Sequence, residues 1–213
     1  MRLGRSHIIG AAAALIAIIG VGVFYLFDGF ELFTGDKELA RRRILAEDFG
    51  RYAKAYQKRT LPWTIDLNSM HVTTDGMKQI DEELVRKYIE IDKNNGINPR
   101  EYNYYADGRI GIGSEYSGYL TLRLPKSGRF EHKYLLRVYD KYGNLRAKMS
   151  TAEFVGDTKF LNITEMIIYR NMKMKLSDKG VIMSANCDSI ASIFTSEVRD
   201  YQIGAQGAIE RLK

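Results

Sequence analysis

The stretch that decides the fold is EYNYYADGRIGIGSEYSGYLTLRLPKSGRFEHKYLLRVYDKYGNLRAKMSTAEF, residues 101–154 of the 213-residue chain. Apolar and polar residues alternate along it with a period of two, which is the pattern of half-buried β-strands. Turn-forming residues interrupt the pattern at Asp107-Gly108, at residues 125–128 and at residues 140–144. We therefore predict hairpins in series, with antiparallel strands over 101–105, 109–113, 116–124, 130–139 and 145–154.

The segments on either side of this stretch predict helices and one more hairpin. On the N-terminal side, helical spacing predicts an amphipathic helix over 36–59 and a second helix over 77–93. On the C-terminal side, the sequence predicts a hairpin of 171–176 with 181–185, a strand or a helix over 162–170, and a closing helix over 187–199 with a weaker helical tail to Lys213. The predicted fold class is α+β: an N-terminal transmembrane helix, an amphipathic helix, then a mainly antiparallel β-sheet domain with a C-terminal helix.

The transmembrane prediction rests on residues 8–27, IIGAAAALIAIIGVGVFYLF, which contain no charged residue. A run of roughly 20 apolar residues is long enough to cross about 30 Å of hydrocarbon as a helix. A cleaved signal peptide is the alternative, since Arg2 and Arg5 form a short basic leader, but the run is longer than a usual signal core and ends without a small-residue cleavage site. We therefore predict an uncleaved anchor, whose representative residues are Ile8, Leu15, Ile19, Val23 and Phe27.

The anchor divides the chain into four predicted parts. These are a cytoplasmic head over 1–7, the anchor over 8–27, a connector with the amphipathic helix over 28–60, and an extracytoplasmic α+β domain over 61–213. Arg2 and Arg5 favour a cytoplasmic N-terminus, whereas Lys37 and residues 41–43 argue the opposite way. We choose the first orientation, which predicts a single-pass protein of a bacterial inner membrane with its C-terminal domain in the periplasm.

Composition is that of an ordinary globular protein. Hydrophobic residues make up 45% and charged residues 27%, with three prolines and one cysteine, which excludes a disordered, collagen-like or disulfide-stapled chain. Cys187 has no second cysteine with which to form an internal disulfide, so its thiol is either buried or pairs between molecules.

Catalytic and metal-binding patterns are sparse. Outside the head the only histidines are His71 and His132, and no G-x-S-x-G elbow or zinc-ligand spacing accompanies them. Residues 92–97, DKNNGI, resemble a calcium loop, but Gly96 arrives at position five where such loops need it at six, so we predict a helix end and turn. The sequence therefore predicts no enzyme, no cofactor and no metal. An enzyme, the alternative, would depend on the two histidines.

Ligand contact is a further hypothesis. The net charge of +6 would allow weak contact with a polyanion. Tyr102, Tyr104 and Tyr105, with Arg109, form a candidate contact surface, although tyrosines in an antiparallel sheet more often pack against cross-strand neighbours.

A resemblance concerns residues 10–63, where an apolar span is followed by a short polar break and a helix with Ala40-Arg41 and the Tyr-rich run FGRYAKAY over 49–56. This order resembles the N-terminal part of type IVb pilins and conjugative minor pilins, and Cys187 ahead of an apolar segment is similar to their C-terminal region. The resemblance implies cleavage of a short leader at Gly10 and packing of the apolar helix into a filament. Leu15 stands where that family carries Glu.

The function predicted from the sequence is a non-catalytic, single-pass, extracytoplasmic subunit of a bacterial envelope assembly, such as a secretion, conjugation or pilus apparatus. Its expected partners are the membrane and other envelope-assembly proteins, including further copies of itself. The residues expected to form the assembly seam are Leu45, Phe49, Tyr52 and Tyr56. Two alternatives stay open: a membrane-tethered periplasmic domain that binds or senses a ligand, and a pilin-like filament subunit.

Overall fold

The structure is a computed structural model that describes residues 44–66, 73–90, 96–127, 131–157, 160–184 and 190–213. The chain divides into two compact units, Met1–Glu47 and Asp48–Lys213, and the second contains the whole sheet. None of the described helices is long and apolar enough to cross a membrane. The expected anchor over 8–27 and the cleavage point at Gly10 lie outside the described residues.

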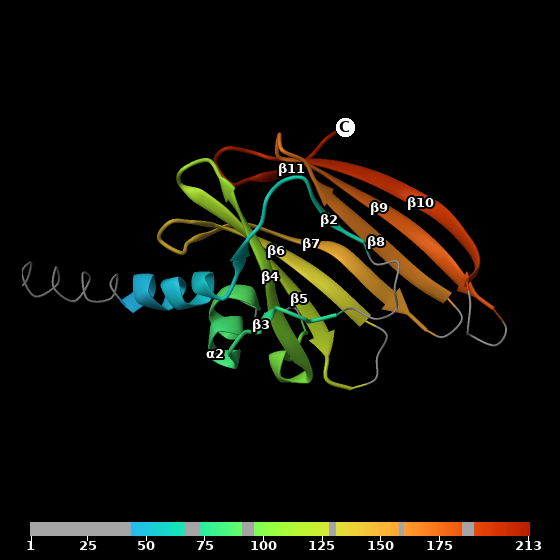
Figure 1. Cartoon of the computed structure of the whole chain (residues 1–213), viewed down its shortest axis with the longest axis horizontal. Coiled ribbons are helices and arrows are strands. Elements are labelled where there is room, and N and C mark those ends of the chain that lie inside the picture. The colour runs from blue at the N-terminus through green and yellow to red at the C-terminus, as the bar shows by residue number, and fades with distance from the viewer. Residues whose placement is uncertain (1–43, 67–72, 91–95, 128–130, 158–159, 185–189) are drawn as a thin grey trace, which may run out of the picture. The chain divides into compact units, whose positions relative to one another are not determined.

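The second unit is a long antiparallel meander in which each strand pairs with the next along the chain (Figure 1). Its strands are β4 (Tyr102–Ile112), β5 (Tyr116–Pro125), β6 (Glu131–Asp140), β7 (Leu145–Gly156), β8 (Phe160–Ile168), β9 (Lys173–Met183), β10 (Ile190–Ile203) and β11 (Ile209–Arg211). Alternating side chains and short connections favour this order, because tight turns join neighbouring antiparallel strands.

Three short strands complete the sheet. β1 (Gln57–Lys58) lies parallel to β4, and β3 (Lys78–Gln79) lies antiparallel to it, so the outer edge of β4 is partly covered. β7 pairs with β8 only at residues 161–164 of β8, and β2 (Trp63–Ile65) pairs with residues 166–168. The two ends of β8 therefore have different neighbours on the same side.

The first hydrophobic core lies on one face of β4–β6 and extends to β7, β8 and β9. Cross-strand pairing places Leu120 opposite Leu136 and Gly118 opposite Val138 on this face. The most deeply buried residues of this core include Leu120, Leu122, Leu136, Val138, Met166, Ile168, Met174 and Leu176.

The second core lies on the opposite face of β4–β6 and is built mainly from aromatic rings. Residues 44–54 are helical and contribute Phe49 and Tyr52, and Tyr56 follows the helix; these rings pack with Tyr119 and Tyr139 of the sheet. A short helical segment, α2 (Glu82–Leu84) followed by the π-helical turn η1 (Val85–Ile89), also contributes to this core. The hydroxyl of Tyr56 donates to that of Tyr52 at 2.9 Å and also bonds Thr121 of β5, so the polar ends of these rings are satisfied inside the core.

The predicted fold class is wrong, because the described chain is mainly β and has no C-terminal helix. Residues 190–203 form β10, and 209–211 form β11 where the helical tail was expected. Ile193 and Phe194 are register partners of Val181 and Gly180, so these adjacent side chains lie on opposite faces of a strand. The apolar spacing fits a helix as well as this strand, and pairing with β9 decides between them.

Three local predictions are also corrected. Asp107-Gly108 is a bulge inside one continuous strand β4, because Ala106 pairs with Thr121 and Gly108 with Leu120, which leaves Asp107 as the extra residue. Residues 177–180 lie within β9 and do not form a turn. The helix expected over 77–93 is shorter, since residues 78–79 form β3 and the helical residues are 82–89. The strands expected over 116–124 and 145–154 are confirmed, and the ambiguous 162–170 is mostly strand β8.

Replacing Leu136 by Ala should lower the free energy of unfolding by about 2–5 kcal/mol, because this side chain is fully buried in the first core and its truncation leaves a cavity. Urea unfolding of the full-length chain, followed by the fluorescence of Trp63, measures the change. Leu212→Ala is the matched control, since Leu212 is 38% exposed and its truncation should change the free energy by less than about 0.5 kcal/mol. Equal losses in the two variants would contradict the burial described for Leu136.

Candidate functional site

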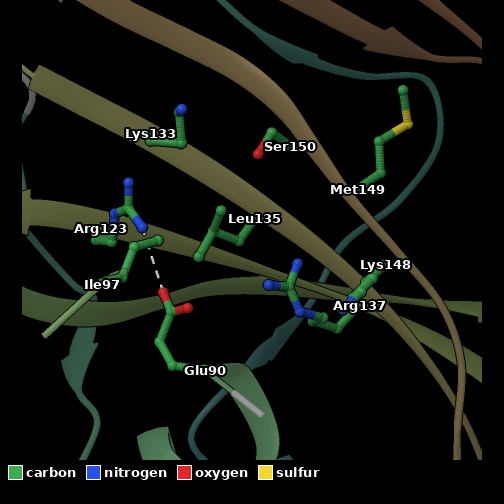
Figure 2. A pocket seen from close by; sticks show the side chains of 9 residues that line it. All are labelled: Glu90, Ile97, Arg123, Lys133, Leu135, Arg137, Lys148, Met149 and Ser150. Carbon is green, nitrogen blue, oxygen red and sulfur yellow. Dashed lines mark hydrogen bonds and ion pairs between the residues drawn. The ribbon is translucent and has the colours of Figure 1, made fainter. Parts of the chain in front are cut away.

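The candidate site is a cavity of about 290 Å³ over β5, β6 and β7 (Figure 2). It lies on the face of the sheet that carries the aromatic core, at the end of η1. The lining residues are Glu90, Ile97, Arg123, Lys133, Leu135, Arg137, Lys148, Met149 and Ser150. Lys133, Leu135 and Arg137 are alternate residues of β6, so the period of the strand places all three on one face.

The lining carries four cationic side chains and one carboxylate. Strand register places these cations in pairs, because Arg123 is the partner of Lys133 across β5 and β6, and Arg137 is the partner of Lys148 across β6 and β7. Like charges directly opposite each other destabilise an antiparallel sheet. The cations of each pair therefore repel each other, and nearby anions are needed to offset that repulsion.

The first pair has anionic partners within the protein. The Arg123 side chain is 5% exposed, and its guanidinium lies 3.3 Å from an oxygen of Glu90 and 2.8 Å from one of Glu131. Lys133 pairs with Glu153 on β7 at 3.0 Å. Burial by itself would lower the pKa of Arg123, but the hydrogen bond that it donates to Glu131 and the charge of Glu90 raise that pKa, so the guanidinium stays cationic.

Tyr104 joins the same network from β4. Its hydroxyl donates to Glu90 Oε1 at 3.0 Å, which gives the buried carboxylate a second partner besides Arg123. Burial, reinforced by the charge of Glu90, raises the pKa of Tyr104 far above its usual value. Tyr104 is therefore a neutral donor at all ordinary pH values and holds Glu90 in place.

Arg137, one member of the second pair, is held by main-chain carbonyl groups. Arg137 is 7% exposed, and its Nε and Nη2 donate to the carbonyl oxygen of Ile89 at 3.4 and 3.2 Å, while Nη1 donates to that of Leu136 at 3.2 Å. Within the part of the chain that the structure describes, no carboxylate forms an ion pair with Arg137. Main-chain carbonyls orient a guanidinium, but they do not neutralise its charge.

The structure separates the four residues of the predicted ligand contact. Two of them contact residues that line the cavity. Tyr104 donates a hydrogen bond to Glu90, and the ring centroid of Tyr102 lies 4.6 Å from the guanidinium carbon of Arg123. Tyr105 packs against the first core on the other side of β4. Arg109 is paired with Tyr119 on β5 and with Lys58 on β1, away from this cavity lining.

The predicted assembly seam is divided as well. Phe49, Tyr52 and Tyr56 are buried in the domain's own aromatic core, so its own sheet covers these rings. Leu45, in the first unit, is 39% exposed. A self-contained core therefore takes up three of the four residues.

Of His71, His132 and Cys187, only His132 lies among the described residues. His132 lies on β6, where its ring stacks on Phe154 with centroids 5.4 Å apart, while His71 and Cys187 lie outside the described residues. Among the residues that are described, no group of three His, Cys, Asp or Glu side chains is arranged to hold a metal ion.

The sequence reasoning missed Arg137 and Lys148. The signal for Arg137 was a charge inside an otherwise apolar run, Leu135-Leu136-Arg137-Val138-Tyr139. A charged residue flanked in this way is expected to be buried on one face of the strand and to need a partner there.

A second feature is the outer edge of β10. β9 pairs along one side of this strand from Ile190 to Gln202, whereas β11 pairs on the other side only with residues 201–203. No other described strand pairs with the outer side. Three large apolar side chains are exposed here: Ile193 at 56%, Phe194 at 45% and Val198 at 49%. The ring of Phe194 lies over Gly180 of β9 and 6.3 Å from the ring of Phe160 on β8.

No protein-family model matches the sequence, and comparisons with curated proteins and with solved structures find no match either.

Replacing Arg123 by Gln should lower the free energy of unfolding by about 3–5 kcal/mol, because it breaks the buried ion pair between Arg123 and Glu90. Urea unfolding of the full-length chain gives the size of the loss.

Lys141→Gln is the control for Arg123→Gln. It breaks the pair of Lys141 with Glu115, in which both side chains are about half exposed, and should leave the urea midpoint almost unchanged. A small effect of Arg123→Gln, similar to that of the control, would show that the network around Glu90 contributes little to stability.

Proposed function

We propose that this chain is a non-catalytic subunit of a bacterial envelope assembly, held at a membrane by its apolar segment 8–27, and that it binds a neighbouring protein through the outer edge of β10. The observation that carries this proposal is the outer edge of β10 between Ile190 and Arg199, with which no described strand pairs and along which Ile193, Phe194 and Val198 are exposed. The apolar segment supports the membrane location.

An unpaired strand edge presents free N–H and C=O groups in a row, which is a template for a strand of another chain. Proteins that avoid such pairing usually place Lys, Pro or a covering segment at the edge. Residues 190–196, IASIFTS, contain no charged residue and no proline. By contrast, β1 and β3 partly cover the edge of β4 at the other end of the sheet. The two edges of the sheet therefore differ in how well they are protected.

The side chains of β10 suit the same mode of binding. Ile193 and Phe194 lie on opposite faces of the strand, since their partners on β9 are the adjacent residues Val181 and Gly180. A strand added to this edge would cover part of both side chains. Fully burying an aliphatic or aromatic side chain contributes about 1.5–3 kcal/mol, and these half-exposed groups would contribute a part of that. Main-chain hydrogen bonds would supply affinity, and the two apolar faces would supply selectivity.

Site-specific photo-crosslinking tests this proposal in the cells that naturally produce the protein. A photoreactive residue at Thr195, an exposed position of β10, should give a discrete adduct of higher mass. The same residue at Tyr142, which is 66% exposed in the turn between β6 and β7, should not give one.

Ile193→Lys provides the matched test of mechanism, because it places a charge on the apolar edge without touching the buried cores. It should abolish the adduct from Thr195 while leaving the urea midpoint of the protein unchanged. Equal adducts from Thr195 and Tyr142, or a monomer alone at both positions, would refute binding through β10.

A further inference from the structure

We propose that the cavity over β5, β6 and β7 binds a small organic molecule through an oxyanion group, a phosphate or a carboxylate, that pairs with Arg137. Such binding would add a ligand to the assembly role and would not depend on the edge of β10.

Arg137 is a buried cation whose partners are main-chain oxygens. Its side chain is more than nine-tenths buried, and its hydrogen bonds go to the carbonyl oxygens of Ile89 and Leu136. A guanidinium has five N–H donors, and three of them are used by these bonds. A buried cation without a carboxylate is costly, and no carboxylate among the described residues forms an ion pair with Arg137. The guanidinium of Arg137 therefore has both the charge and the free donors to bind an anion.

Lys148 is the second cation of this part of the cavity. It is the register partner of Arg137 across β6 and β7, it lines the same cavity, and its side chain reaches the exposed side of the site. Both side chains are cationic and line one cavity, so an oxyanion bound between them would interact favourably with both. Arginine is suited to the inner position, because its planar fork can bind a phosphate or carboxylate with two parallel hydrogen bonds.

The remaining lining restricts the kind of molecule. Ile97, Leu135 and Met149 offer apolar surface, and none of the nine lining residues is aromatic, so the site lacks a stacking platform for a nucleobase. A volume of about 290 Å³ is at the small end of ligand cavities. Glu90, which follows Ile89 in the chain, also lines the cavity (Figure 2) and would repel a second anionic group. These features favour a small molecule with one oxyanion group and an apolar remainder.

Two sources can supply this chemistry: a soluble anion or the phosphate headgroup of a lipid. Isothermal titration calorimetry of the full-length chain in neutral detergent distinguishes a soluble anion from a lipid headgroup. The soluble probes are inorganic phosphate and butyrate, and the lipid probe is dihexanoyl phosphatidic acid, with dihexanoyl glycerol as its uncharged control.

We expect at least one of the three anionic probes to bind, and the control lipid not to bind. Arg137→Gln should weaken that binding at least tenfold, and Lys148→Gln, at an exposed position with little structural cost, should weaken it about threefold to tenfold. Arg146→Gln is the matched control, because Arg146 lies on the same strand, pairs with Asp140 and does not line the cavity, so it should leave the affinity unchanged.

The probe that binds shows which kind of ligand the cavity takes. Binding of phosphate or butyrate identifies a soluble ligand, and binding of the lipid probe alone identifies a headgroup. The proposal is overturned if no anionic probe binds at 10 mM or below, or if Lys148→Gln and Arg146→Gln bind equally well. The Lys148 comparison keeps the test valid if Arg137→Gln does not fold, and neither result bears on crosslinking through β10.

Discussion

The constraint on which the structure depends is that β4, β5 and β6 are buried on both faces. Leu120 and Leu136 form part of the first core on one face, while Tyr119 and Tyr139 form part of the aromatic core on the other. A strand with two buried faces cannot place its polar residues in solvent. Each charged residue in these strands therefore has to be satisfied inside the protein or at the border of a core, which is why the charges gather where the helical cover ends.

The two ends of the sheet follow from the same arrangement. At the β4 end, helical residues cover the face of the sheet and two short strands cover part of its edge. At the β10 end, the strand extends beyond β11, and Ile193 and Val198 are about half exposed on it. The sheet is therefore covered at its β4 end, whereas its β10 end can contact another protein. The exposed apolar side chains of β10 lie along the same edge with which no other described strand pairs.

Local signals allowed part of this fold to be predicted from the sequence. Alternation and turn residues identify the strands over 116–124 and 145–154, because both signals act within a few residues. They fail where distant pairing decides: Ile190, Ile193, Phe194 and Val198 fit a helix equally well, and only the register with β9 makes them a strand. Asp107-Gly108 has turn chemistry, but the sheet uses it as a bulge, where the Asp107 carboxylate accepts a hydrogen bond from Arg59.

The candidate site shows a further limit, because its residues come from three strands and become neighbours only through register. Arg123 and Lys133 flank a turn that the sequence does predict, so their pairing could have been derived by aligning the hairpin. Arg137 and Lys148 depend on the next hairpin, whose irregular register shifts the partners. In a sequence whose local features otherwise agree with the fold, a buried Arg between apolar residues is an exception, and such exceptions are expected at functional positions. Leu or Met at position 137 would pack against Leu135 and the sheet without the desolvation cost, so stability alone gives no reason for a guanidinium there. A bound anion gives that reason, since the charge that is unfavourable in the empty cavity becomes the main source of affinity in the occupied one.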